Sequence, residues 1–343
     1  MERTVTMVKG PAAVRVEGMC SVLGMDVSGM QVSVRPGKAL PFEPEAGCWL
    51  DISGESWPAD PSHAGTSMWK RVAGRILAKH VTVMLIGGTD TGKSTLSIYL
   101  ANAALKAEIV PCVIDGDIGQ GDLAPPGAIG AAMVSAPAVD LRDVAASSVE
   151  FVGITSPAGL ERLVARRMLS MLSRMRGAAS LFIVNTDGYV SDGGLRYKRM
   201  LARTIRPDIV VVIGRERKLA ASMAHGPWLL LRARSACQAT KTRQDRIGRR
   251  VEQFMRYIGQ EMVEKNIASL QFVYRGRRLP AGCALQLLAQ DMFVALGSKG
   301  RVDGFGLVQG VDADNIMIKT AILDFSTLYL SDIAIRDGAE VRL

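Results

Sequence analysis

Histidine and cysteine are both scarce in this sequence. The 343 residues include three histidines (His63, His80 and His225) and five cysteines, and no two cysteines form a C-x-x-C pair. An odd number of widely spaced cysteines argues against a disulfide framework and against a structural zinc site. Three dispersed histidines exclude a multi-histidine metal centre. Chemistry in this protein therefore has to depend on Lys, Arg, Asp, Ser, Thr and backbone amides.

Long hydrophobic runs are also absent. The longest apolar stretches are Val81–Ile86 and Ile209–Ile213, far below the ~20 residues that a membrane-spanning helix requires. The first residues, Met1–Thr4, lack the charged-then-apolar pattern of a signal peptide. Hydrophobic residues still make up 48% of the chain, enough to bury a core. We therefore expect a soluble, intracellular, globular protein of two or three domains, cytoplasmic in a prokaryote and nuclear in a eukaryote.

Positive charge is concentrated in one region. The formal net charge is +9, but Leu160–Pro280 alone holds 25 basic and 9 acidic residues, a net charge of +16. The rest of the chain is left with −7. A basic region on an otherwise acidic chain favours a polyanionic partner such as a nucleic acid. A solvated basic face without a partner is the alternative.

The pattern of apolar residues divides the chain into three predicted domains. Residues 1–66 contain short apolar runs broken by Gly and Pro, which predicts an N-terminal β-rich domain. Residues 67–262 alternate continuous apolar strands with helices, which predicts an α/β domain whose parallel sheet is covered on both faces. Residues 263–343 return to short β signals and predict a C-terminal β-rich domain.

Individual elements of the α/β domain follow from the same periodicity. The strands are expected at 81–87, 108–115, 149–154, 180–185 and 208–213. The helices are expected at 67–80, 93–106, 156–175 with Ser156-Pro157 at its start, 195–205 and 239–257.

The strongest motif lies between the strand at 81–87 and the helix at 93–106. Its residues, Gly87-Gly88-Thr89-Asp90-Thr91-Gly92-Lys93-Ser94-Thr95, match G-x-x-x-x-G-K-[ST] without departure. Glycines permit a tight loop whose backbone N–H groups surround phosphates, and the helix N-terminus adds its dipole. Lys93 would contact the β- and γ-phosphates, and Ser94 would offer its hydroxyl to Mg²⁺. The motif predicts a P-loop NTPase sheet, flanked by the two β-rich domains, that binds ATP or GTP.

Polar side chains follow two further predicted strands. Asp115-Gly116-Asp117-Ile118-Gly119-Gln120 ends one strand, and Asn185-Thr186-Asp187-Gly188-Tyr189 ends another. Because open parallel sheets bind ligands at the carboxyl ends of their strands, both segments are expected to face the phosphates. Asp117 could hold Mg²⁺ or accept a proton from an attacking hydroxyl. The alternative for Asp115 is a solvated cap of a turn, and the alternative for Asp187 is a capped turn that closes a buried strand.

An arginine-rich helix contributes the last candidate residues. Arg246 and Arg250 are four residues apart and therefore share one helix face. Folded over a nucleotide, they would stabilise negative charge on a transferring phosphoryl group. Arg243 and Arg249 compete for the same assignment, and a solvated helix or a nucleic-acid-binding face is the alternative.

Together these segments resemble the polynucleotide 5′-hydroxyl kinases of the RNA-processing type. That family includes the kinase of pre-mRNA 3′-end and tRNA-splicing complexes, the pre-ribosomal RNA kinase and shorter archaeal relatives. The resemblance rests on the order of the three zones, on the arginine helix and on four segments: GGTDTGKST (87–95), DGDIGQGDLAPPGAIG (115–130), GITSP (153–157) and NTDGY (185–189).

The resemblance implies a reaction and a set of residue roles. The reaction is Mg²⁺-dependent transfer of the γ-phosphate of ATP to the 5′-hydroxyl of a polynucleotide, RNA in the first place and DNA as the alternative. Asp117 takes the position assigned to water-mediated Mg²⁺ binding and to activation of the 5′-hydroxyl, and Gln120 is its paired glutamine. The implied substrate clamp consists of Asn185, Thr186 and Tyr189, and the implied lid residues are Arg246 and Arg250. Eukaryotic members commonly carry Trp where Tyr189 stands, although Tyr can also stack on a base.

Two other functions remain open at the level of the sequence. One is a catalytically silent, ATP-bound scaffold of an RNA-processing complex, against which the retained Lys93, Ser94 and Asp117 argue. The other is a small-molecule P-loop enzyme similar to dethiobiotin synthetase, because G-T-D-T-G at 88–92 also suits that family. The basic region and the flanking β-rich domains argue against the small-molecule enzyme.

Overall fold

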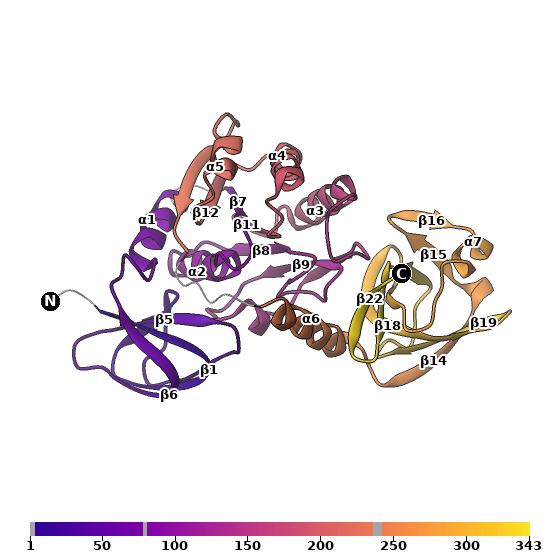
Figure 1. Ribbon diagram of the computed structural model, residues 1–343, viewed down its shortest axis with the longest axis horizontal. Coiled ribbons are helices and arrows are strands. Elements are labelled where there is room, and N and C mark those ends of the chain that lie inside the picture. Colours follow the sequence, from indigo (N-terminus) through magenta and orange to yellow (C-terminus); the bar gives the residue numbers. More distant parts are fainter. Residues whose placement is uncertain (1–3, 78–80, 236–241) are drawn as a thin grey trace. The chain divides into compact units, whose positions relative to one another are not determined.

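The computed structural model describes residues 4–77, 81–235 and 242–343 (Figure 1). The chain divides into two compact units. Unit 1 comprises Met1–Ile114, Ala132–Ala145 and Met175–Lys241, and unit 2 comprises Asp115–Ala131, Ala146–Arg174 and Thr242–Leu343. The predicted borders at residues 66 and 262 fall inside these units, so the division into three domains stays a prediction.

Unit 1 begins with an antiparallel sheet of six strands. They are β1 (Val5–Glu17), β2 (Cys20–Val22), β3 (Met25–Asp26), β4 (Gln31–Val34), β5 (Ala39–Pro44) and β6 (Trp49–Ala59). Their order is β3-β2-β5-β1-β4, and β6 pairs with β1. In β4 the polar Gln31 and Ser33 are exposed while Val32 and Val34 are buried, the alternation expected of a strand with one face on a core. The predicted N-terminal β-rich fold is confirmed.

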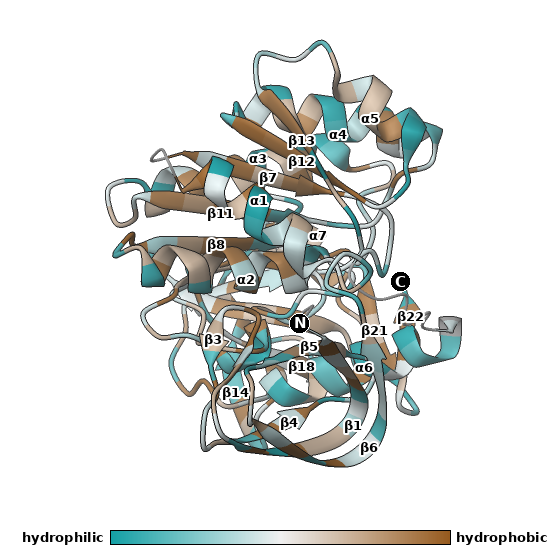
Figure 2. Cartoon of the chain, turned by 90° about the vertical axis from the view of Figure 1, so that its left-hand side faces the viewer, coloured by the Kyte–Doolittle hydropathy of each residue, from teal (hydrophilic) through white to brown (hydrophobic). Residues whose placement is uncertain are grey.

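The second sheet of unit 1 is parallel. The strands of this sheet that begin in unit 1 are β7 (Thr82–Ile86), β8 (Pro111–Gly116), which enters unit 2 at Asp115, β11 (Leu181–Thr186), β12 (Ile209–Ile213) and β13 (Leu229–Ala233), and their order is β8-β11-β7-β12-β13. The strand β7 lies between β11 and β12 and is parallel to both. All five residues of β12 are buried, and Figure 2 shows the strands of this sheet as predominantly hydrophobic. Such strands require cover on both faces.

Four helices provide that cover. They are α1 (Thr66–Ile76), α2 (Lys93–Lys106), α4 (Asp192–Ile205) and α5 (Arg217–Met223). Helix α2 contacts β7, β11 and α1, whereas α5 contacts β12 and α4 (Figure 1). The sequence pattern missed α5 and β13, and it placed the starts of α4 and β8 three residues away from where they lie.

Unit 2 contains the helices α3 (Glu161–Met175), whose last residue falls in unit 1, α6 (Arg243–Tyr257) and α7 (Ala281–Leu285). Its large sheet has the order β14-β19-β18-β17-β20-β15-β16. These strands are β14 (Glu261–Asn266), β15 (Gln271–Tyr274), β16 (Arg277–Leu279), β17 (Phe293–Ser298), β18 (Arg301–Val311), β19 (Asn315–Thr320) and β20 (Thr327–Leu330). A terminal hairpin follows, formed by β21 (Ile333–Arg336) and β22 (Ala339–Arg342). The predicted C-terminal β-rich fold is confirmed.

Aromatic side chains attach α6 to this sheet. Phe293 and Phe305 stack with ring centroids 5.5 Å apart, and Phe254 of α6 meets Phe293 edge-on at 4.7 Å. The hairpin residues Ile333 and Ile335 belong to the same buried cluster. Because one core holds the helix, the sheet and the hairpin, their positions in unit 2 are mutually fixed.

One prediction about the parallel sheet is wrong, and one strand was missed. The strand expected at 149–154 is β10 (Ser148–Phe151), and it runs antiparallel to β9 (Ala128–Met133), which the pattern missed. The segment AIGAAM of β9 is poor in the β-branched and aromatic residues that signal a strand.

Three predicted helix ends differ from the structure or lie outside the described residues. Helix α3 begins at Glu161 and not at Pro157, because Gly159 adopts φ = 84° and the Leu160 amide closes a turn onto the Pro157 carbonyl. Residues 78–80 of the predicted first helix, and residues 239–241 of the predicted arginine helix, lie outside the described residues. Among the residues that are described, no helix is both long enough and apolar enough to cross a membrane.

The packing of α1 yields a stability prediction. Trp69 is fully buried, its Nε1 donates a hydrogen bond to the Arg234 carbonyl at 3.2 Å, and its ring lies 5.6 Å from that of Tyr99. Trp69→Ala should lower the free energy of unfolding by about 3–5 kcal/mol, measured by urea denaturation followed by circular dichroism. The control is Trp49→Ala, because Trp49 is 69% exposed and should cost less than about 0.5 kcal/mol. Equal effects of the two substitutions would contradict the burial assigned to Trp69.

Candidate nucleotide-binding site

The P-loop of unit 1 has the geometry of a phosphate site. It connects the end of β7 to the start of α2, and Asp90 and Gly92 adopt φ of 57° and 88° in the left-handed region. The Thr91 hydroxyl donates to the Gly88 carbonyl at 2.9 Å. Within the part of the chain that the structure describes, no side chain caps the N-terminus of α2, and its first turn carries no acidic residue. Its first N–H groups are therefore suited to an anion.

Lys93 lies inside this loop. Its side chain is buried, and Nζ donates to the Gly87 carbonyl at 3.1 Å and to the Gly88 carbonyl at 2.6 Å. A buried ammonium group requires negative or polar partners, and the loop holds it where a triphosphate would supply them. Ser94, the next residue, accepts a hydrogen bond from Asn185 Nδ2 at 3.3 Å. The structure thus brings the P-loop serine and the predicted clamp asparagine together.

The loops that follow β11 and β12 press against the P-loop. A Cβ atom at Gly188 would lie 2.7 Å from the amide nitrogen of Thr89. One at Gly87 would lie 2.7 Å from the Ile213 carbonyl, and one at Gly88 would lie 3.1 Å from Glu216 Oε1. The backbone of the P-loop is therefore in direct contact with the backbone of both neighbouring loops at this edge of the sheet. The sequence analysis did not single out Glu216, since a single acidic residue after a strand carries no motif.

Within the segment NTDGY, Asp187 organises the turn. Lys198 of α4 has no exposed surface, and its Nζ lies 2.9 Å from both the carboxylate Oδ1 and the carbonyl oxygen of Asp187. The Tyr189 amide donates to the same Oδ1 at 2.8 Å. The structure therefore favours the alternative given above for Asp187, a capped turn. Lys198 had no signal in the sequence, because it is one of several cations on its helix.

The other two residues of the predicted clamp differ in access. Thr186 is fully buried, and its hydroxyl donates to the Leu85 carbonyl at 2.8 Å, which ties β11 to β7. The Tyr189 ring packs on the start of α4, where a Cβ atom at Gly193 would lie 2.3 Å from the Tyr189 hydroxyl. Tyr189 is partly exposed and Thr186 is not. Their roles toward a substrate stay predictions.

In unit 2, backbone amides hold the segment that contains Asp117. Asp117 Oδ1 accepts hydrogen bonds from the amides of Gly119 at 3.2 Å and Gln120 at 2.9 Å. Asp115 is buried, and its Oδ2 accepts from the Asp122 amide at 2.6 Å. Burial, and after it the negative charges of Asp122 and Asp117, raises the pKa of the Asp115 carboxyl to about 6. Asp115 thus caps the turn, as the alternative for it states, but it does so as a buried and not as a solvated carboxylate.

Helix α6 lies along the same segment. Gln120 Nε2 donates to the Arg246 carbonyl at 3.2 Å, and Gln253 Nε2 donates to the Gly121 carbonyl at 3.1 Å. Arg249 forms an ion pair with the buried Asp122. The helix N-terminus carries a capping box between Thr242 and Asp245, a start signal that the sequence analysis had not used.

The predicted lid arginines have different surroundings. Arg250 forms an ion pair with Glu340 of the terminal hairpin, whereas the backbone of Arg246 accepts the bond from Gln120. Arg249, one of the two competing positions, is engaged by Asp122. The side chain of Arg243 and all of Lys241 lie outside the described residues.

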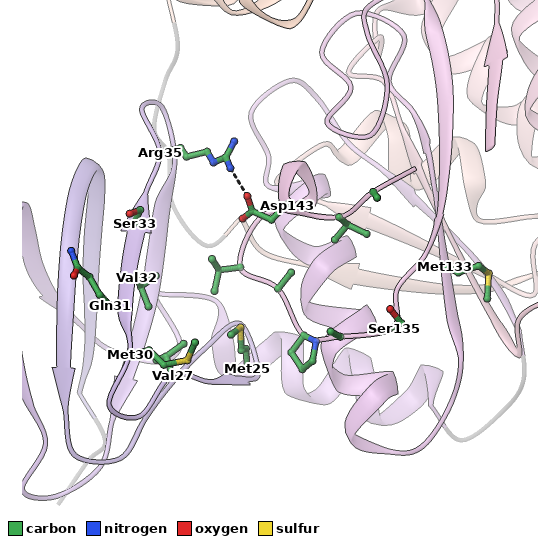
Figure 3. Close-up of a pocket in the computed structure, with 16 residues that line it drawn as sticks. Met25, Val27, Met30, Gln31, Val32, Ser33, Arg35, Met133, Ser135 and Asp143 are labelled. Atoms are coloured by element: carbon green, nitrogen blue, oxygen red, sulfur yellow. Dashed lines mark hydrogen bonds and ion pairs between the residues drawn. The ribbon is translucent and has the colours of Figure 1, made fainter. Parts of the chain in front are cut away.

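Unit 1 also contains a cavity of about 490 Å³ (Figure 3). It lies between strand β4 and the segment 133–145, and Met25, Met30 and Met133 contribute to its lining. Arg35 and Asp143 form an ion pair beside it. None of the predicted site residues lines this cavity.

The sequence was compared with known proteins. A curated polyribonucleotide 5′-hydroxyl-kinase of Thermococcus kodakarensis is 34% identical over 135 residues, which cover 39% of this chain and 38% of the relative. One of Pyrococcus abyssi is 35% identical over 146 residues, or 42% of this chain and 41% of the relative. The match thus spans about two fifths of the length of these relatives. Bovine polyribonucleotide 5′-hydroxyl-kinase Clp1 is 28% identical over 193 residues, which cover 50% of this chain and 45% of the bovine protein.

The fold was compared with solved structures. A chain in the structure of the wild-type Clp1p–Pcf11p complex matches this fold with a TM-score of 0.73 at 12% sequence identity. The match covers 97% of this chain and 96% of the chain in the complex. This likeness confirms the predicted fold class, a P-loop NTPase sheet with additional β-rich parts. The family model of the mRNA cleavage and polyadenylation factor CLP1 P-loop matches residues 87–260, just over half of the sequence. The chain belongs to this family.

Proposed function

We propose that this protein is an ATP- and Mg²⁺-dependent kinase that phosphorylates the 5′-hydroxyl end of a polynucleotide, RNA in the first place. The observation that carries the proposal is the P-loop with its buried Lys93 and with Asn185 on the Ser94 hydroxyl. The archaeal relatives, named polyribonucleotide 5′-hydroxyl-kinases, support the same reaction.

The residues present fit ATP and Mg²⁺. The uncapped N-terminus of α2 and the Lys93 ammonium suit the β- and γ-phosphates. The Ser94 hydroxyl, which Asn185 orients, and the Asp117 carboxylate are oxygen donors of the kind that Mg²⁺ prefers. When bound, ATP supplies the phosphoryl group and Mg²⁺ neutralises part of its charge.

The chain's own contribution is positioning and proton transfer. Phosphoryl transfer requires an attacking hydroxyl in line with the leaving oxygen, with little covalent chemistry from the protein. In the proposal, Asp117 orients the 5′-hydroxyl and accepts its proton. Backbone amides hold its Oδ1, which fixes the carboxylate against rotation. Arg246 and Arg250 of α6 stabilise the charge that develops on the γ-phosphoryl oxygens.

The basic region 160–280, with its net charge of +16, supports a polyanionic substrate such as RNA. Cationic side chains that neutralise phosphates release counterions, so binding of RNA should weaken steeply as salt increases. GTP as a second donor and DNA as a second acceptor belong to the same proposal. A protein partner in RNA processing also belongs to it, since the structural relative was solved with Pcf11p.

The decisive test is a transfer assay with γ-labelled ATP or GTP, Mg²⁺ and matched 5′-hydroxyl RNA and DNA oligonucleotides. Lys93→Ala should lower transfer at least about 100-fold, because it removes the cation from the phosphate site. Lys106→Ala, at the exposed end of the same helix, should leave transfer unchanged. Label on RNA in the wild type and its loss in Lys93→Ala would support the kinase. ATP binding without any transfer would support a scaffold instead.

Asp117→Asn separates chemistry from loop structure. An Asn Oδ1 can accept the same amide hydrogen bonds from Gly119 and Gln120, so the loop should keep its fold while the charge is lost. Turnover should fall roughly 100-fold or more, with the Kd for ATP, measured by calorimetry, within about tenfold of the wild type. An equal loss of affinity and turnover would make Asp117 a metal anchor and not the base.

Gly188→Ala tests the contact between the NTDGY segment and the P-loop. The added Cβ atom would meet the Thr89 backbone at 2.7 Å, so one of the two loops has to move. Transfer should fall at least about tenfold. The matched control is Gly74→Ala in α1, where an added Cβ atom has no neighbour within 4 Å. Unchanged transfer in Gly188→Ala would argue against a substrate or nucleotide role for this edge of the sheet.

A further inference from the structure

The terminal hairpin of unit 2 contacts one of the proposed lid arginines. Arg250 Nε donates to Glu340 Oε2 of β22, and both side chains are largely buried, at 22% and 14% exposed. Within the described part of the chain, the two terminal amino groups of Arg250, Nη1 and Nη2, form no hydrogen bond. The carboxylate therefore binds the guanidinium at Nε. The edge formed by Nη1 and Nη2 can still donate two hydrogen bonds to another acceptor.

Glu340 is itself held in place. Its second carboxylate oxygen, Oε1, accepts a hydrogen bond from the Thr155 hydroxyl at 2.7 Å. The hairpin backbone is anchored by Ile333 and Ile335, which belong to the aromatic core that also contains Phe254 of α6. The helix that carries Arg250 and the hairpin that carries Glu340 are thus both anchored in one packed cluster.

The same contacts extend to the segment that contains Asp117. A Cβ atom at Gly119 would lie 2.8 Å from the Thr155 carbonyl, so the backbone of Thr155 packs directly on this segment. A connected path therefore runs from the Asp117 segment through Thr155 and Glu340 to Arg250, entirely within unit 2.

This geometry suits a phosphate-binding arginine. A guanidinium presents paired donors in a rigid fork, and phosphate oxygens match the fork bidentately. A long side chain without a fixed partner loses rotamer entropy when it is ordered on a ligand. A carboxylate bound to Nε orders the side chain before a phosphate binds, so less rotamer entropy is lost when Nη1 and Nη2 donate to the phosphate.

We infer that Glu340 is a positioning residue for Arg250, so that the terminal hairpin, through Thr155 and Glu340, orients the lid arginine for the transferring phosphoryl group. The inference rests on the proposed kinase function and assigns a role to the C-terminal β-rich part of the chain. The opposite reading, in which Glu340 withholds Arg250 from the nucleotide, predicts a higher kcat for Glu340→Gln and for Thr155→Val.

The test is a double-mutant cycle in the transfer assay, with kcat and the KM values for ATP and RNA measured for each variant. Glu340→Gln should lower kcat roughly 10-fold to 100-fold, the scale of a misplaced catalytic group, with the KM for RNA unchanged. In an Arg250→Ala background, Glu340→Gln should have no further effect on kcat, because its target is gone.

Two further variants complete the design. Thr155→Val removes only the hydroxyl that orients Glu340, so it should lower kcat in the same direction, by less, and also lose its effect in the Arg250→Ala background. It keeps the test decisive if Glu340→Gln disturbs the hairpin, which thermal denaturation by circular dichroism detects. Asp337→Asn removes a charge from the exposed turn of the same hairpin, at φ = 49°, which Asn tolerates, and should leave kcat unchanged.

The outcomes distinguish this inference from the function on which it rests. A wild-type protein that transfers no label contradicts the proposed kinase. An active wild type with an equally active or faster Glu340→Gln variant, or with effects of Glu340→Gln and Arg250→Ala that simply add, overturns the inference and leaves the kinase standing. A loss that disappears in the Arg250→Ala background supports both.

Discussion

Direct contact between backbones around the P-loop is the constraint on which the candidate site in unit 1 depends. Gly87 and Gly188 both lie where a Cβ atom would be within 2.7 Å of backbone atoms, on Ile213 and Thr89 respectively. These contacts exist because β11 and β12 flank β7 in parallel, so that the three loops at their carboxyl ends converge. A loop packed this closely has little freedom, and preorganised donors of this kind are what charge stabilisation requires.

In unit 2 the equivalent constraint is the attachment of α6. Its apolar face is fixed by Phe254 in the aromatic core, and its polar face is fixed by the pair between Arg249 and Asp122 and by the bond from Gln253 to Gly121. Removal of one partner from such a buried pair would leave an uncompensated charge. An arginine helix fixed in this way can present further side chains at defined places, and Arg250 on Glu340 is one of them.

The charge pattern and the fold together explain why a basic chain can remain compact. Many of the cations between 160 and 280 are engaged within their own unit, for example Arg167 and Arg174 on the buried Glu150 and Lys198 on Asp187. The buried Lys198 contributes to structure and cannot contact a polyanion, whereas Arg167 and Arg174 keep part of their side chains exposed while paired with Glu150. The cations that remain exposed are therefore the ones available to a nucleic acid, and a net charge counted from the sequence does not separate the two groups.

The sequence by itself determined the P-loop, the start of α2 at Lys93 and the strands around it, because these depend on local glycine geometry and on continuous apolar runs. It also determined the family through short contiguous motifs. Only the tertiary structure decided which arginine of α6 meets which carboxylate, that Asp187 serves a buried Lys198, and that β10 pairs antiparallel with β9. These contacts join residues that are not neighbours in the chain, since Asp187 and Lys198 are 11 positions apart and Arg250 and Glu340 are 90 apart. The pattern of apolar and polar residues carries no information on these contacts, because it reflects only residues that are close in the chain.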